Sequence, residues 1–139
     1  MTINEKQDEL IEDFAFYEDW MEKYEYIIQL GKELPLIDEK YKTEDYIIKG
    51  CQSKVWLHPD MNDQGTVDFA ADSDAIITKG LVSLMVKVLS GHTPKEIADA
   101  DLYFIDQIGL KDHLSPTRAN GLLAMVKQMK LYAVALQMK

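Results

Sequence analysis

The stretch KVWLHPDMNDQGTVDFA, residues 54–70, decides the fold that we expect for this chain. Its first five residues alternate in character, so that Val55 and Leu57 fall on one face of an extended strand. A turn-rich segment follows at 59–65, and residues 66–70 then alternate in the same way. Two alternating segments joined by a turn predict an antiparallel β-hairpin.

Helical patterns flank this hairpin on both sides, and strands do not alternate with helices along the chain. The short β-prone segment 46–48 adds a third strand to the expected sheet. We therefore expect an α+β fold, in which helices pack on a small antiparallel sheet of about three strands. One domain spanning residues 1–139 accounts for the whole length.

Capping residues and glycines indicate where the helices begin and end. The pattern at 76–90 is apolar nearly all round, which predicts a helix buried against the sheet. A first helix is predicted to begin at Thr2 or Asn4, and a second carries an amphipathic stripe from Trp20 to Leu30 and stops at a left-handed Gly31. A third extends from a cap at Asp72, Ser73 or Asp74 to about Ser90. Two more begin at Thr93-Pro94 and at Ser115-Pro116.

The composition limits the classes of partner. Of 139 residues 47% are hydrophobic, and 24 acidic against 15 basic side chains give a formal charge of −9. This charge disfavours nucleic acid and anionic membranes, because phosphate binding needs a basic face. No apolar stretch reaches the roughly 20 residues of a membrane span. The single cysteine cannot form an internal disulfide and no signal peptide is evident, so we expect a cytoplasmic protein.

Common nucleotide and metal motifs are missing from the sequence. There is no GxGxxG and no GxxxxGK[ST], which leaves nucleotide binding without a motif. The three histidines, His58, His92 and His113, lack the close spacing of zinc ligands such as HExxH. We expect neither a metal nor a cofactor in this chain.

Cys51 is the remaining candidate for chemistry. It is the only cysteine, and it stands in the turn-like stretch Gly50–Ser53 between two β-prone segments. A lone cysteine is commonly an inert core residue. However, Gly50 opens backbone conformations that other residues avoid, and reactive groups are often held on loops. The residues alone support an inert and a reactive Cys51 about equally.

A reactive Cys51 admits more than one chemistry. A thiol hydrolase or peroxidase would need a nearby histidine, and only folding could bring His92 or His113 close, since His58 is seven residues away along an extended chain. An internal redox disulfide is excluded, since no second cysteine exists. In a third chemistry, Cys51 accepts a group from a partner protein and passes it on. An acidic interaction module with an inert cysteine is a further alternative.

The sequence resembles the SufE family in stretches that follow one another in the expected order. The two most specific are GCQSKVWL at 50–57 and LSPTRANGL at 114–122, with DSDA at 72–75 and KGL at 79–81 between them. Members of this family accept sulfur from cysteine desulfurases during iron–sulfur cluster assembly. The matching stretches span about residues 14–136, nearly the whole chain.

The resemblance implies an α+β fold similar to the NifU-type scaffold domain, with Cys51 on a loop at one end of the sheet. It implies that Cys51 takes persulfide sulfur from a desulfurase of the SufS or CsdA type, stimulates that enzyme, and relays the sulfur toward an iron–sulfur scaffold. Pyridoxal phosphate would belong to the desulfurase, and this chain would be a transfer partner, as a monomer or a homodimer, rather than a free-standing enzyme. Residues expected around the acceptor loop or on the partner-facing surface are Gly50, Gln52, Ser53, Asp74, Arg118, Asn120 and Gly121.

Elementary electrostatics adds to the expectations for two of these residues. Arg118 lies in the first turn after the Ser115 cap, where a cation opposes the helix dipole by up to about 1 kcal/mol, which suggests docking or charge pairing. A surface salt bridge is the simpler alternative for this residue. A cation near Cys51 would also lower the pKa of its thiol. For Asp74, helix capping is the expected role.

Overall fold

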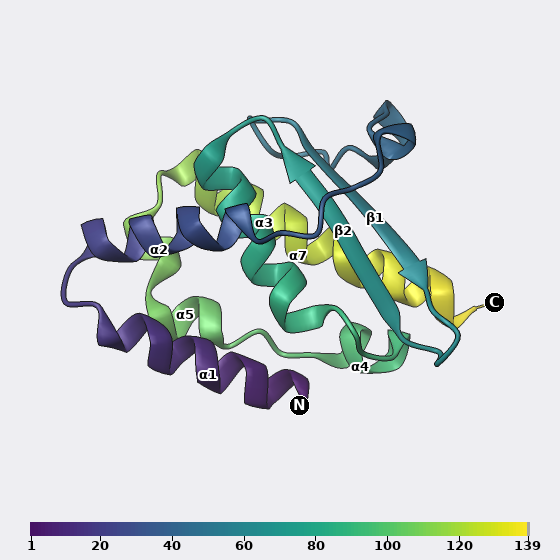
Figure 1. Cartoon of the computed structure of the whole chain (residues 1–139), viewed down its shortest axis with the longest axis horizontal. Helices are drawn as coiled ribbons and strands as arrows, with labels where there is room; N and C mark the ends of the chain where they lie inside the picture. Colours follow the sequence, from purple (N-terminus) through teal and green to yellow (C-terminus); the bar gives the residue numbers. More distant parts are fainter. Residues whose placement is uncertain (139) are drawn as a thin grey trace.

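An antiparallel hairpin forms the centre of the computed structural model, which describes residues 1–138 (Figure 1). Strand β1 (Val55–Met61) pairs with β2 (Val67–Ser73) along its whole length, from Val55 opposite Ser73 to Met61 opposite Val67. Val55 and Leu57 are fully buried on the inner face. The predicted hairpin and the α+β class are therefore confirmed.

The predicted third strand is wrong. Among the described residues the sheet has two strands, and Glu44–Tyr46 forms a 3₁₀ turn, as does Glu39–Tyr41. Only an isolated bridge between Ile47 and Trp56 remains of the expected pairing. The 3₁₀ turn ends at Tyr46 and the chain turns again at Gly50, which has a φ of 97°, so too few extended residues lie between them to form a ladder with β1.

Seven α-helices occur among residues 1–138. The caps predicted at Thr2, Thr93 and Ser115 are confirmed, since each side-chain oxygen accepts a backbone N–H three residues ahead. The two helices of at most five residues were not predicted. The helices are α1 (Ile3–Phe16), α2 (Trp20–Lys32), α3 (Ile76–Leu89), α4 (Pro94–Asp99), α5 (Phe104–Ile108), α6 (Leu110–His113) and α7 (Pro116–Gln137).

Helix α3 is the central helix of the core. Most of its side chains are buried, as its nearly continuous apolar pattern predicted. It contacts β2, α2 and α7, and in Figure 1 α3 runs beside β2 while α7 passes behind the hairpin. These contacts hold α3 in place and position α7 beside it. The two helices form the walls of the site described below.

Two glycines allow α2 and α3 to pack very closely. A Cβ atom at Gly80 would lie 2.4 Å from the Ile27 carbonyl oxygen, and one at Gly31 would lie 3.0 Å from the Gly80 nitrogen. Gly31 is therefore not the left-handed stop that we predicted. The helix continues to Lys32, and Gly31 is required by the neighbouring helix rather than by the end of its own.

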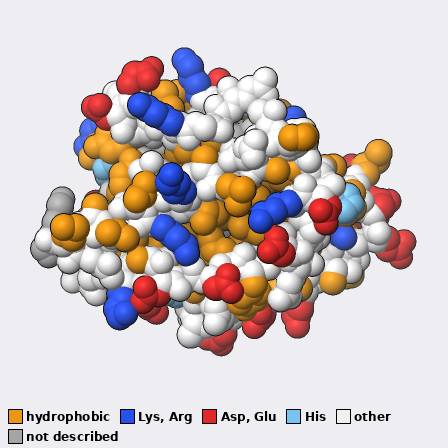
Figure 2. Space-filling view, turned by 180° about the vertical axis from the view of Figure 1, so that it is seen from behind, with side chains coloured by type: hydrophobic (Ala, Val, Ile, Leu, Met, Phe, Trp, Pro, Cys, Tyr) orange, Lys and Arg blue, Asp and Glu red, His pale blue; other side chains and the backbone are white. Residues whose placement is uncertain are grey.

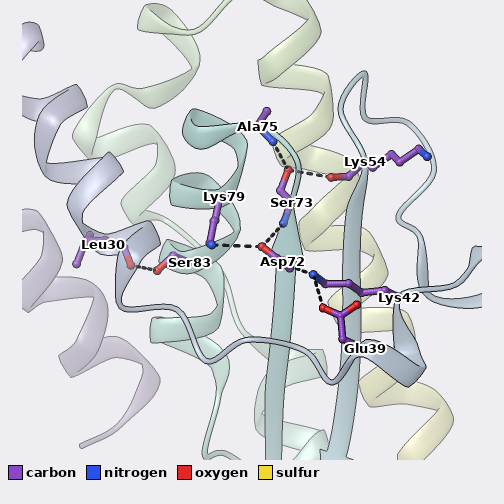
Figure 3. Close-up of polar contacts among 9 residues, drawn as sticks. All are labelled: Leu30, Glu39, Lys42, Lys54, Asp72, Ser73, Ala75, Lys79 and Ser83. Carbon is purple, nitrogen blue, oxygen red and sulfur yellow. Dashed lines mark hydrogen bonds and ion pairs between the residues drawn. The ribbon is translucent and has the colours of Figure 1, made fainter.

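The predicted cap of α3 is also wrong. Ala75 occupies the N-cap position, and no side chain caps the helix. The three expected capping residues bond elsewhere, and Figure 3 shows the contacts of two of them, Asp72 and Ser73. Asp72 forms ion pairs with Lys42 at 2.6 Å and Lys79 at 3.3 Å, and Ser73 and Asp74 contact the loop that precedes β1. Within residues 1–138, no helix is long and apolar enough to cross a membrane.

Candidate functional site

Cys51 lies in a short closed loop at the open end of the hairpin. The loop is closed at its base, because the Ile48 N–H donates to the Val55 carbonyl at 2.8 Å. Gly50 turns the chain with its positive φ, a conformation that a side chain would strain. A Cβ atom at Gly50 would also lie 3.2 Å from Ala124 of α7. Glycine at this position therefore brings the cysteine against the helix.

The connection between β2 and α3 holds the other end of the loop. The Ser73 hydroxyl donates to the Lys54 carbonyl at 2.8 Å and accepts the Ala75 N–H at 3.2 Å (Figure 3). The Asp74 carboxylate accepts the Lys54 N–H at 3.0 Å. Asp74 thus anchors the loop that carries the cysteine, which corrects the capping role that we expected for it.

Helix α7 forms the floor beneath the thiol. The Cys51 thiol donates to the Gly121 carbonyl oxygen at 3.5 Å. A Cβ atom at Gly121 would lie 3.4 Å from Cys51 Sγ, at van der Waals contact, so a larger side chain would occupy the space around the sulfur. Gly121 therefore provides room next to the reactive atom.

A cavity of about 460 Å³ opens beside Cys51. It brings together six of the eight residues predicted for the site, whereas Gly50 and Asn120 do not line it and Asn120 is exposed. Sequence reasoning missed the contribution of the first turn of α3. Ala75 and Thr117 were not named as site residues either, although they lie within the stretches 72–75 and 114–122 that resemble the family. The lining residues are Cys51, Gln52, Ser53, Asp74, Ala75, Ile76, Ile77, Thr78, Leu81, Thr117, Arg118, Gly121 and Met125.

Burial is the dominant influence on the pKa of the Cys51 thiol. The side chain is half-buried, and removal from water raises the pKa of Cys51 above its ordinary value. The lowering of this pKa that we expected from Arg118 is not found, although Arg118 lines the same cavity.

Arg118 itself forms no ion pair within the described part of the chain. Among residues 1–138 no carboxylate lies within 4.0 Å of the Arg118 guanidinium. The salt-bridge alternative is therefore wrong, and this exposed cation stands free at the cavity.

The first turn of α3 adds a second electrostatic feature. Ile76, Ile77 and Thr78 line the cavity, and the helix they begin has no side-chain cap. Uncapped N–H groups at a helix start favour negative charge nearby. The cavity therefore combines a neutral resting thiol with groups that can stabilise an anion.

The three histidines lie in other environments. His58 stacks on Tyr41, and His113 stacks on Trp20. His92 is buried, and its backbone forms an isolated β-bridge with Val67, at the end of β2 that lies away from Cys51. No histidine lines the Cys51 cavity, and within the described part of the chain no cluster of three or more His, Cys, Asp or Glu could hold a metal ion.

Comparison with known proteins places this chain in a family. A family model described as "SufE: Fe-S metabolism associated domain" matches residues 8–133. The chain belongs to the SufE family. As a SufE-family protein it has a role in iron–sulfur metabolism, which confirms the broader part of the functional expectation.

Two relatives of this SufE-family chain come from rhizobia. An uncharacterised SufE-like protein of Rhizobium etli is 41% identical over 127 residues, covering 88% of this chain and 86% of the relative. Another from Rhizobium meliloti is 39% identical over 127 residues, covering 88% and 91%. The solution structure of a hypothetical protein from Thermus thermophilus has the same fold, with a TM-score of 0.80 at 18% identity and coverage of 96% and 97%.

The raised pKa of Cys51 makes a direct prediction about its reactivity. The thiolate is the nucleophile, so alkylation by iodoacetamide should accelerate with pH around a midpoint above the ordinary thiol value of about 8.5. Mass spectrometry of timed samples would give the midpoint, with the urea-unfolded chain as the control at the ordinary value. A midpoint below that of the unfolded chain would mean that Arg118 and the start of α3 outweigh burial.

Proposed function

We propose that this chain is a sulfur acceptor, in which Cys51 takes persulfide sulfur from a cysteine desulfurase of the SufS or CsdA type. The transfer stimulates the desulfurase, and the sulfur is relayed toward an iron–sulfur scaffold. The observation that carries the proposal is the setting of Cys51. A lone, half-buried thiol faces a cavity with a free cation and no histidine, in a chain of the SufE family.

The proposed step is a thiol–persulfide exchange. The Cys51 thiolate attacks the outer sulfur of the desulfurase persulfide, and a new S–S bond forms on Cys51 while the bond within the desulfurase persulfide breaks. The desulfurase cysteine leaves as a thiolate, and the transferred sulfur keeps its proton or releases it to solvent. Charge and oxidation state balance across the exchange, so no further oxidant or reductant is needed.

The cavity supports the acceptance and protection of the extra sulfur. The space beside Gly121 is free of a side chain, and the thiol is already half-removed from water. A persulfide is more acidic than a thiol, and its anion would face the uncapped start of α3 and the Arg118 side chain. These features favour the persulfide anion formed by the transfer. The resting thiol, by contrast, stays protonated, because burial raises its pKa.

The remaining residues fit a surface that receives a partner. Gln52, Asp74 and Arg118 are exposed around the mouth of the cavity, and Ser53 is partly exposed. We assign them to loop shaping and docking, together with Gly50, Asn120 and Gly121. The desulfurase supplies pyridoxal phosphate and forms the first persulfide, so this chain needs no cofactor of its own.

The contacts of the thiol also weigh against a thiol hydrolase or peroxidase. Such an enzyme needs a base within hydrogen-bonding distance of the sulfur. The hydrogen bond of Cys51 goes to a backbone carbonyl, which cannot take up its proton. Among residues 1–138, Asp74 is the one carboxylate that lines the cavity, and it accepts the Lys54 N–H.

Mass spectrometry after incubation with a cognate desulfurase and L-cysteine tests the proposal. We expect a mass increase of one sulfur atom, mapped to the peptide containing Cys51 and removed by dithiothreitol. Incubation without L-cysteine is the control. An unmodified Cys51 beside a desulfurase that carries its own persulfide would contradict the proposal.

A further inference from the structure

Helix α7 differs in charge from the rest of the molecule. The chain has 24 acidic and 15 basic residues, yet the 22 residues of α7 include no Asp or Glu. They carry Arg118, Lys127 and Lys130 instead, and the Lys130 amine is occupied by the Ala100 carbonyl. Among residues 1–138, Lys127 has no ion-pair partner. An unpaired cation therefore stands on an acid-free helix of an acidic protein.

Apolar side chains surround Lys127 on the outside of α7. Leu123, Leu131 and Val134 are 47%, 51% and 45% exposed. Their spacings of eight and three residues place them on one face of the helix, with Lys127 between them. Figure 2 views the molecule from this side and shows basic side chains among hydrophobic ones across its middle, with acidic side chains at the upper left, along the lower edge and on the right-hand side.

A groove of about 500 Å³ runs beside this face. Ala124, Lys127 and Leu131 of α7 form one wall, and the segment 44–49 forms the other. Lys49, at the end of the segment 44–49, adds a second cation, while Glu44 and Asp45 stand at the start of the same segment. Acidic groups of a ligand would therefore fit beside Lys127 and Lys49 and be repelled from Glu44 and Asp45.

The groove is separate from the Cys51 cavity but next to the same loop. No residue lines both hollows. Gly50 approaches Ala124 on the groove side, whereas Cys51 contacts Gly121 on the cavity side. A partner bound in the groove would thus contact Lys49, two residues before the cysteine, and leave the cavity open.

We propose that this α7 face, defined by Leu123, Lys127, Leu131 and Val134 with the adjoining groove, docks an acidic amphipathic helix of a partner protein. Apolar anchors three to four residues apart on such a helix would cover the exposed leucines and valine, and its Glu or Asp residues would pair with Lys127 and Lys49. The surface is additional to the cavity through which Cys51 is proposed to receive sulfur.

Charge favours this occupant over a second copy of the chain. Antiparallel pairing of α7 with the α7 of a second copy, centred on the apolar residues from Leu123 to Val134, would place two Lys127 ammonium groups near the symmetry axis. Like charges facing each other across an interface are destabilising. An acidic helix satisfies the same apolar surface and the cation together.

Fluorescence anisotropy with synthetic helical peptides tests the proposal on the whole chain. The probe is a fluorescein-labelled peptide of Leu, Ala and Glu with leucines three and four residues apart, and the comparison peptides replace Glu by Lys or scramble the order. We expect saturable, salt-sensitive binding of the acidic amphipathic peptide only. The double variant K127E/L131E should raise its Kd by about tenfold or more. M21E, at a 74% exposed position on α2, is the matched control that should bind normally.

Backbone amide chemical shifts locate the bound peptide and show whether the variants fold. The expected shifts fall on residues 47–49 and 123–134. Absence of saturable binding, equal binding of the lysine peptide, unchanged binding by K127E/L131E, or shifts confined to other surfaces would each overturn the proposal. So would sedimentation showing a dimer that L131E dissociates, since a second copy would then cover the face. Persulfide formation on Cys51 is measured separately, so either proposal can fail alone.

Discussion

Replacing Cys51 by serine should return a stimulated cysteine desulfurase to its basal rate while leaving this protein folded. Serine keeps the size and the hydrogen bond to the Gly121 carbonyl, but its hydroxyl is a far weaker nucleophile than a thiolate at neutral pH. The measurement is sulfide or alanine production from L-cysteine at saturating acceptor, with circular dichroism to confirm the fold. Because Cys51 is the only cysteine, no other thiol of the chain can replace it.

A displaced thiol provides a matched control for this prediction. The double variant C51S/S53C keeps one cysteine in the same loop and the same cavity, but moves it away from the Gly121 contact. If position matters as proposed, stimulation should stay below about a tenth of the wild-type effect. Full stimulation by C51S itself would show that the chain activates the desulfurase by binding alone, and would contradict sulfur acceptance at Cys51.

Local signals in the sequence predicted much of this structure. The alternation of Val55 and Leu57 and the caps at Thr93 and Ser115 depend on neighbours a few residues away, so they could be recognised without the fold. The resemblance to the SufE family likewise identified six of the thirteen residues that line the cavity.

The errors concern residues whose contacts are distant in the sequence. Asp74 stands where a helix cap is expected, yet it bonds to Lys54, twenty residues earlier. The first turn of α3 enters the cavity only because core packing places it there. The pKa of Cys51 similarly depends on burial, which the polar neighbours Gln52 and Ser53 did not indicate. Such contacts require the tertiary structure.

Replacing Gly80 by alanine should cause the largest loss of stability of any single methyl addition considered for this chain. The added Cβ would lie 2.4 Å from the Ile27 carbonyl oxygen and 2.5 Å from Ile27 Cγ2, and the carbonyl belongs to the rigid backbone of α2. The gain in helix propensity, about 1 kcal/mol, is smaller than the cost of separating two packed helices. We expect G80A to lower the free energy of unfolding by about 3 kcal/mol or more, measured by urea denaturation.

Gly31 and Lys87 turn this expectation into a graded test. A Cβ atom at Gly31 would meet Gly80 at 3.0 Å, a milder contact, so G31A should destabilise less than G80A. K87A changes an exposed position of α3 and should leave the free energy of unfolding nearly unchanged. If G80A proved as stable as K87A, α2 and α3 would have to move apart at little cost. That result would contradict the close crossing of these helices, and with it the reason for Gly31 within α2. A loss that follows the order G80A, G31A, K87A would instead show that the crossing, rather than helix propensity, requires glycine at both positions.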